Sequence, residues 1–490
     1  MPDRDGFLPW GFEFFGLVMK KNDEVTVTIE DLGFQGEGIG RSGPLTLFVP
    51  FALPGEKVRA KVLHVKKNLA FAKLEDVLTP AEERVRPECG VFGKCGGCQF
   101  QHLRYSYQLR FKSETVKRCF QKIARLNPEV SPTVRSENPY GYRNKLQIPV
   151  GYSKGRTVIG FYAPNSHRIV ETSACALQPA WSERMIKTLR KFMEQNHLRG
   201  YDETDGSGDI RHIIVRDVAG KLLVTVVVNG KKFAFRKELC EAFSREFDPL
   251  GLYINFNDAD TNVVTGKEFE HLYGLKTVEA VSHGMKYQIH PASFYQVNDA
   301  IRERIYTKIQ QLVSESGCRA VVDAYSGAGV LTAILTKTGC DCYGIEIVPE
   351  ATANAEYVRC ANCLFDSMHN INGDCAEKLP ELVEMLARQG KRTAVILDPP
   401  RKGCERNVLE AIKKCEIPCV IYLSCNPATL ARDIGILLGT CHSDGSPKPA
   451  EEIDSDALDY RISLVQPYDM FPATKHIETL VCLERRNHNI

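Results

Sequence analysis

The chain has 490 residues, which is too long for one ordinary hydrophobic core, so two or three domains are expected. Hydrophobic residues make up 43% and charged residues 25%, as in a soluble globular protein. The formal net charge is only +2, which excludes a strong overall field, so any nucleic-acid partner must be met by local basic patches.

The N-terminal stretch is apolar but lacks the pattern of a leader or a membrane span. Residues 7–19 are rich in Phe, Trp and Leu, yet Glu13 interrupts them and the run is too short to cross a bilayer. Its start is acidic, unlike that of a signal peptide. We expect residues 1–21 to be a disordered extension or to precede a natural start at Met19, with no membrane partner. The 18 scattered cysteines indicate reduced thiols in a cytoplasmic protein, with a metal-binding or catalytic subset.

Residues 22–82 have an all-β pattern. Val25, Val27 and Ile29 alternate with polar residues, and turn glycines precede further strand-like runs. Five short strands of this kind predict a small closed barrel of the OB type, whose basic residues either bind RNA or form an ordinary solvated face. The run from Gly36 to Arg41, GEGIGR, resembles the TRAM domain of RNA-modifying enzymes.

Three clustered cysteines follow the barrel, with the spacing C-x5-C-x2-C. They are Cys89, Cys95 and Cys98, and two glycines inside the last pair let the backbone wrap tightly around a ligand. A fourth thiolate is needed, and Cys175 is the preferred candidate over Cys119. Zinc would accept such a set, and so would a [4Fe–4S] cluster. In either case we expect a structural site rather than an electron carrier.

The segment 83–285 mixes helices and strands and is expected to form a central α+β domain. Residues 105–124 predict a basic amphipathic helix, and residues 181–195 predict a second helix among strand-like runs. Arg143 and Lys145 precede one of these strands and can either neutralise RNA phosphates or form an ordinary surface pair.

The segment 286–490 reads as a doubly wound α/β domain organised around residues 320–348. A buried strand ending at Asp323 leads into a glycine turn, a helix, and a second strand ending at Glu346. Glycines allow close backbone approach to a ligand, and an acid about 20 residues on can hold a ribose diol. The turn is G-x-G and no Walker lysine follows, which favours an adenosine ligand such as S-adenosylmethionine (SAM) over a dinucleotide.

Ligands in such sheets bind outside the carboxyl ends of the strands. Strand-like runs further along the chain end next to an acid or a cysteine, and residues 460–467 and 477–483 predict a closing antiparallel hairpin. The candidate ligand residues at strand ends and in the glycine turn are Gly327, Gly329, Glu346, Asp374, Asp398 and Cys425.

Four stretches make the chain similar to SAM-dependent RNA uracil-5-methyltransferases, above all to their 23S ribosomal RNA branch. They are the cysteine set with Cys175, FYQVN at 294–298, SCNPATLARD at 424–433 and MFPATKHIE at 470–478. The resemblance covers about residues 20–486. It implies a class I, Rossmann-like methyltransferase domain, a [4Fe–4S] cluster on the four cysteines and 23S RNA as the partner of a monomeric enzyme. It also implies a nucleophile, a general base and cofactor contacts at Cys425, Glu478, Gln296, Tyr325, Glu346 and Asp398.

Two departures from the family pattern stand out. Val330 occupies a position where relatives often carry a polar residue, and Asp398 is followed by Pro-Pro-Arg rather than Pro-Ala-Arg. The first concerns one cofactor contact, and neither touches Cys425 or Glu478.

Methylation of uracil at C5 requires a nucleophile and a general base for chemical reasons that do not depend on the resemblance. C5 of uracil is a weak nucleophile until a thiolate adds to C6, and a base must later remove the C5 proton. We expect the helix N-terminus that follows Cys425 to favour its thiolate. Three alternatives stay open: a tRNA substrate, an amino-methyltransferase that uses the Asp398 loop, and a non-catalytic iron–sulfur RNA-binding protein. If Cys425 or Glu478 does not act, Cys404, His476 or Asp398 would replace it.

Overall fold

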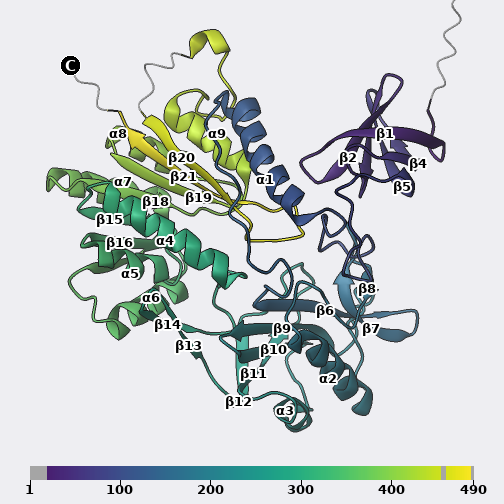
Figure 1. The fold of residues 1–490 in the computed structure, drawn as a ribbon. Helices are drawn as coiled ribbons and strands as arrows, with labels where there is room; N and C mark the ends of the chain where they lie inside the picture. Colours follow the sequence, from purple (N-terminus) through teal and green to yellow (C-terminus); the bar gives the residue numbers. More distant parts are fainter. Residues whose placement is uncertain (1–18, 454–459, 487–490) are drawn as a thin grey trace, which may run out of the picture. The chain divides into compact units, whose positions relative to one another are not determined.

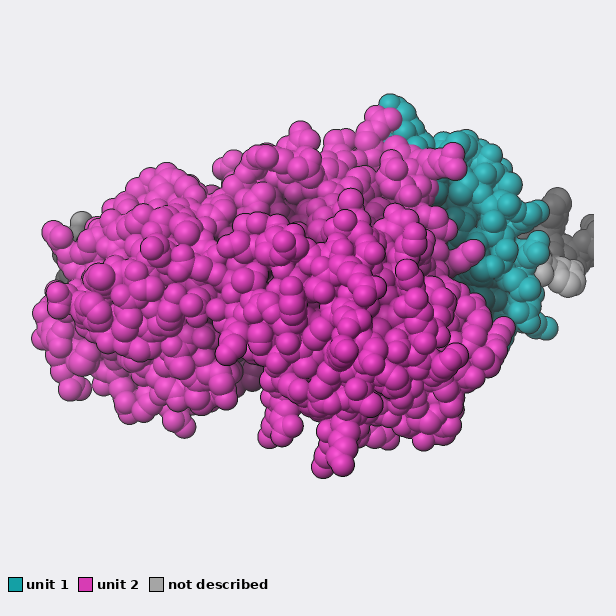
Figure 2. Space-filling view, turned by 90° about the horizontal axis from the view of Figure 1, so that it is seen from below, with its two compact units in different colours: residues 1–84 teal, residues 85–490 magenta. Residues whose placement is uncertain are grey.

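The computed structural model describes residues 19–453 and 460–486, which fall into two compact units, residues 1–84 and 85–490 (Figure 1, Figure 2). The first 18 residues of the expected extension lie outside the described residues. Within the described ranges, no helix is both long enough and apolar enough to cross a membrane.

The first unit contains a closed five-stranded barrel, as the alternating pattern predicts. The strand order is β1-β2-β3-β5-β4, in which β3 and β5 pair in parallel. Val27, Leu47 and Val58 fill its interior. Gly40 is required by a close approach, because a Cβ there would lie 2.5 Å from the carbonyl oxygen of Thr28. The strands are β1 (Glu24–Leu32), β2 (Glu37–Ser42), β3 (Leu45–Pro50), β4 (Lys57–Val65) and β5 (Leu69–Thr79).

The second unit contains a mixed seven-stranded sheet, called the central sheet here, in the order β12-β11-β10-β9-β6-β7-β8. Helices α2 and α3 pack on one face, against apolar residues such as Leu146, Val215 and Val224. Side chains alternate between the two faces of a strand, so the residues next to these in the chain point to the other face of the sheet, away from α2 and α3. The elements are β6 (Lys145–Ser153), β7 (Arg156–Tyr162), β8 (Ile169–Glu171), α2 (Trp181–Gln195), β9 (Ile210–Val218), β10 (Lys221–Asn229), α3 (Arg236–Ser244), β11 (Leu250–Asn257) and β12 (Glu268–Gly274).

A second seven-stranded sheet, green to yellow in Figure 1, has the order β17-β16-β15-β18-β19-β21-β20. The first five strands are parallel, and β21 and β20 form the predicted antiparallel hairpin at the edge. Strands such as β18, in which every residue is buried, are covered on both faces. The strands are β15 (Ala320–Ala324), β16 (Asp341–Glu346), β17 (Met368–Asn372), β18 (Thr393–Leu397), β19 (Cys419–Ser424), β20 (Tyr460–Tyr468) and β21 (Glu478–Arg485).

Helices cover both faces of this sheet. One face is packed by α7, α8 and α9, and the other by α4, α5 and α6 with the hairpin β13–β14. The helix α1, which precedes the central sheet in the chain, packs its Val116 and Cys119 into the first of these cores, beside α9 (Figure 1). The elements are α1 (Tyr105–Cys119), β13 (Val278–Ser282), β14 (Met285–Ile289), α4 (Asp299–Glu315), α5 (Val330–Leu335), α6 (Pro349–Ala361), α7 (Cys375–Arg388), α8 (Arg406–Lys414) and α9 (Pro427–Leu438).

Candidate active site

The predicted ligand residues meet at one edge of the second sheet. Parallel strands β16, β15, β18 and β19 are neighbours, so the residues after their carboxyl ends share that edge. Strand β21 runs antiparallel to β19, and Ser424 pairs with Thr479. The end of β19 therefore places Cys425 beside Glu478, the first residue of β21. Asp398 follows β18, the other neighbour of β19.

The glycine turn after β15 is shaped by positive φ angles and by the carboxylate of Glu346. Gly327 and Gly329 have φ angles of +55° and +73°, values that residues with a Cβ rarely adopt. The N–H of Gly327 donates to Glu346 Oε2 at 2.9 Å, and the N–H of Val348 donates to Oε1 at 2.8 Å. Each carboxylate oxygen keeps a second lone pair for a ligand. Tyr325, at φ +72°, opens the turn.

Two other predicted cofactor residues have structural bonds of their own. Asp374 is the N-cap of α7, and its side chain accepts from the N–H of Ala376 at 2.9 Å. The main-chain oxygen of Gln296 accepts from Asn144 Nδ2 at 2.8 Å, which ties the FYQVN segment to the start of β6. Phe294, two residues before Gln296, is 81% exposed.

Buried carboxylic acids gather at the end of β18. Burial, with the charge of Asp323, raises the pKa of Asp398 to about 7. Burial, with the charge of Asp398, raises the pKa of Glu478 well above its ordinary value, and Glu478 is only 3% exposed. Crowded acids of this kind are stabilised in the ionised form by a nearby positive charge. The edge is therefore suited to a cationic ligand.

The electrostatic setting of Cys425 differs from the expectation. A helix, α9, begins just after Cys425 as predicted, and Asn426 caps it by accepting from the N–H of Ala428 at 3.1 Å. Nevertheless burial and the charge of Glu478 raise the pKa of the Cys425 thiol, while Arg401 lowers it. The expectation of a thiolate favoured by the helix terminus was wrong, because desolvation and a neighbouring acid outweigh it.

Arg401 is the residue near Cys425 that sequence reasoning missed. Its main-chain oxygen accepts from Asn426 Nδ2 at 3.1 Å and from Thr429 Oγ1 at 3.3 Å, so the start of α9 fixes it beside the thiol. A guanidinium here stabilises the thiolate once it forms. Its position three residues after Asp398, at the end of the Pro-Pro-Arg run, was the available signal.

Glu478 is positioned by a loop, residues 469–477, that several distant segments hold. The main-chain N–H groups of Gln99 and Phe100 both donate to the oxygen of Ala473 at 3.0 Å, directly after the third clustered cysteine. From α1, the fully buried Lys112 forms an ion pair with Asp469 at 2.5 Å. The loop that delivers the acid is therefore held both by the cysteine segment and by α1.

The alternative residues lie nearby but in different settings. Burial lowers the pKa of His476 to about 4, so its imidazole is neutral near pH 7. Cys404 is buried, and its pKa is raised by burial. Its N–H donates to Asp433 Oδ2 at 2.8 Å, on the side of the sheet packed by α9.

The four candidate ligand cysteines, Cys89, Cys95, Cys98 and Cys175, line one cavity of about 70 Å³. Cys119 does not line this cavity; it is the last residue of α1 and is buried in the core that α1 shares with α9. Two sulfurs already accept hydrogen bonds, Cys98 from Gln101 Nε2 at 3.2 Å and Cys95 from the N–H of Gly97 at 3.4 Å. Such bonds are typical around metal-bound sulfur.

No group of three or more His, Cys, Asp or Glu side chains in residues 19–453 and 460–486 is arranged to hold a metal ion directly. The sulfurs share their cavity with other side chains, among them Phe161 and Gln178.

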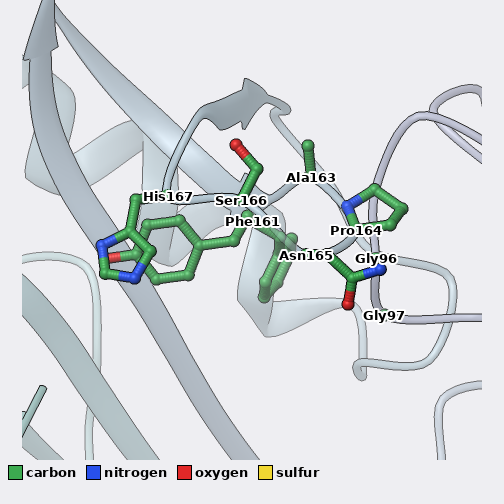
Figure 3. A pocket seen from close by; sticks show the side chains of 9 residues that line it. Gly96, Gly97, Phe161, Ala163, Pro164, Asn165, Ser166 and His167 are labelled. Atoms are coloured by element: carbon green, nitrogen blue, oxygen red, sulfur yellow. The ribbon is translucent and has the colours of Figure 1, made fainter.

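An open hollow of about 580 Å³ lies on the outer side of the cysteine loop (Figure 3). The N–H of Gly96 donates to the oxygen of Tyr162 at 2.9 Å, and a Cβ on Gly96 would lie 3.1 Å from Pro164 N. The cysteine loop therefore packs closely on the β7–β8 turn beside the hollow. Its lining belongs to the β7–β8 turn and the cysteine loop, and includes none of the residues at the strand ends of the second sheet.

The structure separates the two predicted RNA-binding residues. Arg143 lines the cysteine cavity and is held by the hydroxyl of Tyr142 at 3.3 Å. Lys145 pairs across the strands with Arg216 on β9. The two cations, although only two positions apart in the sequence, therefore lie in different surroundings.

Comparisons with known proteins agree with this architecture. Residues 19–74 match the TRAM domain model, and residues 267–486 match the model described as tRNA (Uracil-5-)-methyltransferase. A protein of Clostridium acetobutylicum named as an uncharacterized RNA methyltransferase is 36% identical over 474 residues, covering 95% of this chain and 98% of its own. A protein of the same description from Clostridium tetani is 37% identical over 468 residues, covering 95% and 97%.

The fold also matches a solved structure. The Pyrococcus abyssi tRNA (uracil-54, C5)-methyltransferase, in complex with S-adenosyl-L-homocysteine, aligns with a TM-score of 0.73. It is 24% identical and covers 94% of this chain and 100% of its own. The barrel is thus a TRAM domain and the second sheet has the SAM methyltransferase fold. The chain belongs to the family of SAM-dependent RNA (uracil-5-)-methyltransferases.

Proposed function

We propose that this enzyme forms 5-methyluridine in 23S ribosomal RNA through a covalent bond between Cys425 and C6 of the uracil. The observation that carries the proposal is the neighbouring position of Cys425 and Glu478 at paired strand ends, next to Asp398. An amino-methyltransferase needs no such thiol, and a non-catalytic RNA-binding protein needs neither group.

The geometry supports a sequence of four steps. Cys425, with its thiolate stabilised by Arg401, adds to C6 of uracil and makes C5 nucleophilic. Bound SAM would supply the methyl group: its bond to sulfur would break as C5 takes up the methyl carbon, and S-adenosylhomocysteine would leave. Glu478 then removes the C5 proton, for which its raised pKa makes it a stronger base than an ordinary carboxylate. Loss of that proton expels the Cys425 sulfur and restores the aromatic ring.

The substrate choice rests on the resemblance to the 23S branch, with tRNA as the second candidate because the structural relative is named for uracil 54 of tRNA. The target uridine must be unpaired or flipped from its stack to reach Cys425. The test is methylation of in vitro transcribed 23S RNA and tRNA, followed by mapping of 5-methyluridine. Methylation of tRNA alone would show that the substrate is tRNA rather than 23S RNA. Methylation of an exocyclic amine would overturn the proposal.

We further propose that SAM lies across Gly327 and Gly329 with its ribose hydroxyls on Glu346, and that Gln296, Tyr325, Asp374 and Asp398 complete the site. Glu346→Ala should weaken SAM and S-adenosylhomocysteine (SAH) equally, because both carry the ribose. Loss of hydrogen bonds to a charged acceptor costs about 1.5–3 kcal/mol, or roughly 10- to 150-fold in affinity. Calorimetry with exposed Glu350→Ala as the control measures this, and unchanged affinity in Glu346→Ala would place the cofactor elsewhere.

SAM affinity should depend on pH through the acids of the edge. Because Asp398 has a pKa of about 7, lowering the pH protonates it and removes the negative charge that favours the sulfonium. The affinity for SAM should therefore rise about tenfold from pH 6 to pH 8 and then level off, with protons released on binding. SAH has no sulfonium charge and should show a much smaller change. An equal pH dependence for the two ligands would contradict a cationic sulfur beside Asp398.

We also propose a [4Fe–4S] cluster on Cys89, Cys95, Cys98 and Cys175, supported by the shared cavity and the hydrogen bonds to sulfur. Such a cluster would cross-link the cysteine loop and leave the chemistry to Cys425. Anaerobically purified protein should contain iron and sulfide, and Cys175→Ser should lose them whereas Cys119→Ser should retain them. Stoichiometric zinc without iron would contradict the cluster.

The domain limits that we propose are 22–82, 83–285 and 286–490.

A further inference from the structure

Two positively charged side chains face each other on the central sheet without a negative partner. Lys145 on β6 and Arg216 on β9 are directly paired, so their Cβ atoms lie on the same face about 4.5–5.5 Å apart. Arg216 is 5% exposed, and its Nη1 makes no hydrogen bond among the described residues. Its Nε donates to the main-chain oxygen of Pro291 at 3.1 Å, a neutral acceptor.

No acid in the described part of the chain offsets this charge. Neither residue takes part in an ion pair within 4.0 Å there, and the neighbouring Asp217 points to the opposite face, where it accepts from Trp181 Nε1 at 2.7 Å. Burial and the charge of Arg216 lower the pKa of Lys145 to about 8, and burial lowers the pKa of Arg216 to about 10. Each of these buried cations therefore lowers the stability of the protein without a ligand. Such a cost is expected of residues that bind an anion, because the anion would compensate their charge.

The pair lies beside the segment that leads into the active-site edge. Arg216 donates to the main-chain oxygen of Pro291, and burial, together with the charge of Arg216, lowers the pKa of His290. Five residues beyond Pro291 is Gln296, whose main chain is bonded to Asn144, next to Lys145. The cations stand on the central sheet rather than on the sheet that carries Gly327 and Glu346.

We propose that Lys145 and Arg216 form a subsite for a backbone phosphate of the substrate RNA, close to the target uridine. The proposal rests on the RNA methyltransferase function proposed above and names the group that this face recognises. Lys145, which is half-buried, would contact the phosphate, and Arg216 would raise the positive potential from behind. A phosphodiester offers two anionic oxygens, which suits two adjacent cations.

The test is RNA binding by Lys145→Met, because the Lys145 side chain makes no hydrogen bond within the described residues and its loss should not disturb the fold. Lys187→Met is the matched control, since Lys187 is an exposed lysine on α2, which packs against the opposite face. Filter binding of in vitro transcribed 23S RNA without SAM should show about tenfold weaker binding for Lys145→Met. The slope of log affinity against log salt should fall by about 0.7–0.9, and Lys187→Met should behave as the unaltered enzyme.

A second variant separates recognition from folding. Arg216→Met removes a buried unpaired charge, so its thermal unfolding midpoint should stay the same or rise while RNA binding weakens. A fall of the midpoint would assign Arg216 to a structural role and overturn its part in the subsite.

Two further outcomes would overturn the proposal. Unaltered RNA affinity and salt slope in Lys145→Met would exclude a phosphate contact. Weaker SAM binding with normal RNA binding would assign the pair to the carboxylate of the cofactor instead. Binding is measured without methyl transfer, so a failure of uridine methylation by the unaltered enzyme would be seen separately.

Discussion

Cys425→Ala is expected to abolish methyl transfer, by at least roughly 10⁴-fold, as removal of an essential nucleophile does in other enzymes. Without the sulfur, C5 of uracil keeps too little negative charge to attack a methyl group. The variant should also form no covalent complex with RNA that carries 5-fluorouridine. Exposed Cys360→Ala is the control for the loss of a thiol, and it should retain full activity.

A covalent complex that persists in Cys425→Ala would move the nucleophile to another thiol. Cys404 would be tested first, because it lies beside the loop after Asp398. Its burial and raised pKa make it a poor nucleophile, so we expect Cys404→Ala to form the complex as the unaltered enzyme does.

Glu478→Gln is expected to stall after methyl transfer rather than before it. The amide has nearly the same shape but cannot accept the C5 proton, so the saturated C5 cannot eliminate the sulfur of Cys425. Turnover should fall about 10²- to 10⁴-fold, the range for loss of a general base. Denaturing gels should then show an accumulated protein–RNA complex with ordinary RNA, which the unaltered enzyme turning over should show weakly or not at all.

Full turnover by Glu478→Gln would assign proton removal to another group. His476 is the first candidate, since its pKa of about 4 keeps the imidazole neutral and able to accept a proton near pH 7. Asp398 is the second. The double variant Glu478→Gln with His476→Gln would decide between them.

The elements that sequence predicts well are those set by local periodicity. The helix over residues 181–195 and the strand that ends before Asp398 follow from the spacing of their apolar residues. The candidate residues at strand ends could be predicted too, because parallel strands share one carboxyl edge. The gathering of Glu346, Asp398 and Cys425 is of this kind.

Other features depend on contacts between distant segments and leave no local pattern. Main-chain bonds from Gln99 and Phe100 hold the loop before Glu478, and main-chain groups carry no residue signature. The pairing of Lys145 with Arg216 depends on the register of two strands that are far apart in the chain. The raised pKa of Cys425 likewise results from burial and from a neighbour on another strand, which outweigh the local effect of α9.

The most direct test is mass spectrometry of the complex formed with 5-fluorouridine RNA and SAM. Fluorine cannot leave C5 as a cation, so the complex should stop after methyl transfer with the sulfur still attached at C6. After digestion, we expect one modified peptide, in which Cys425 carries a nucleotide with both fluorine and a transferred methyl group. Attachment at another cysteine, or a methylated RNA without any protein attached, would contradict it.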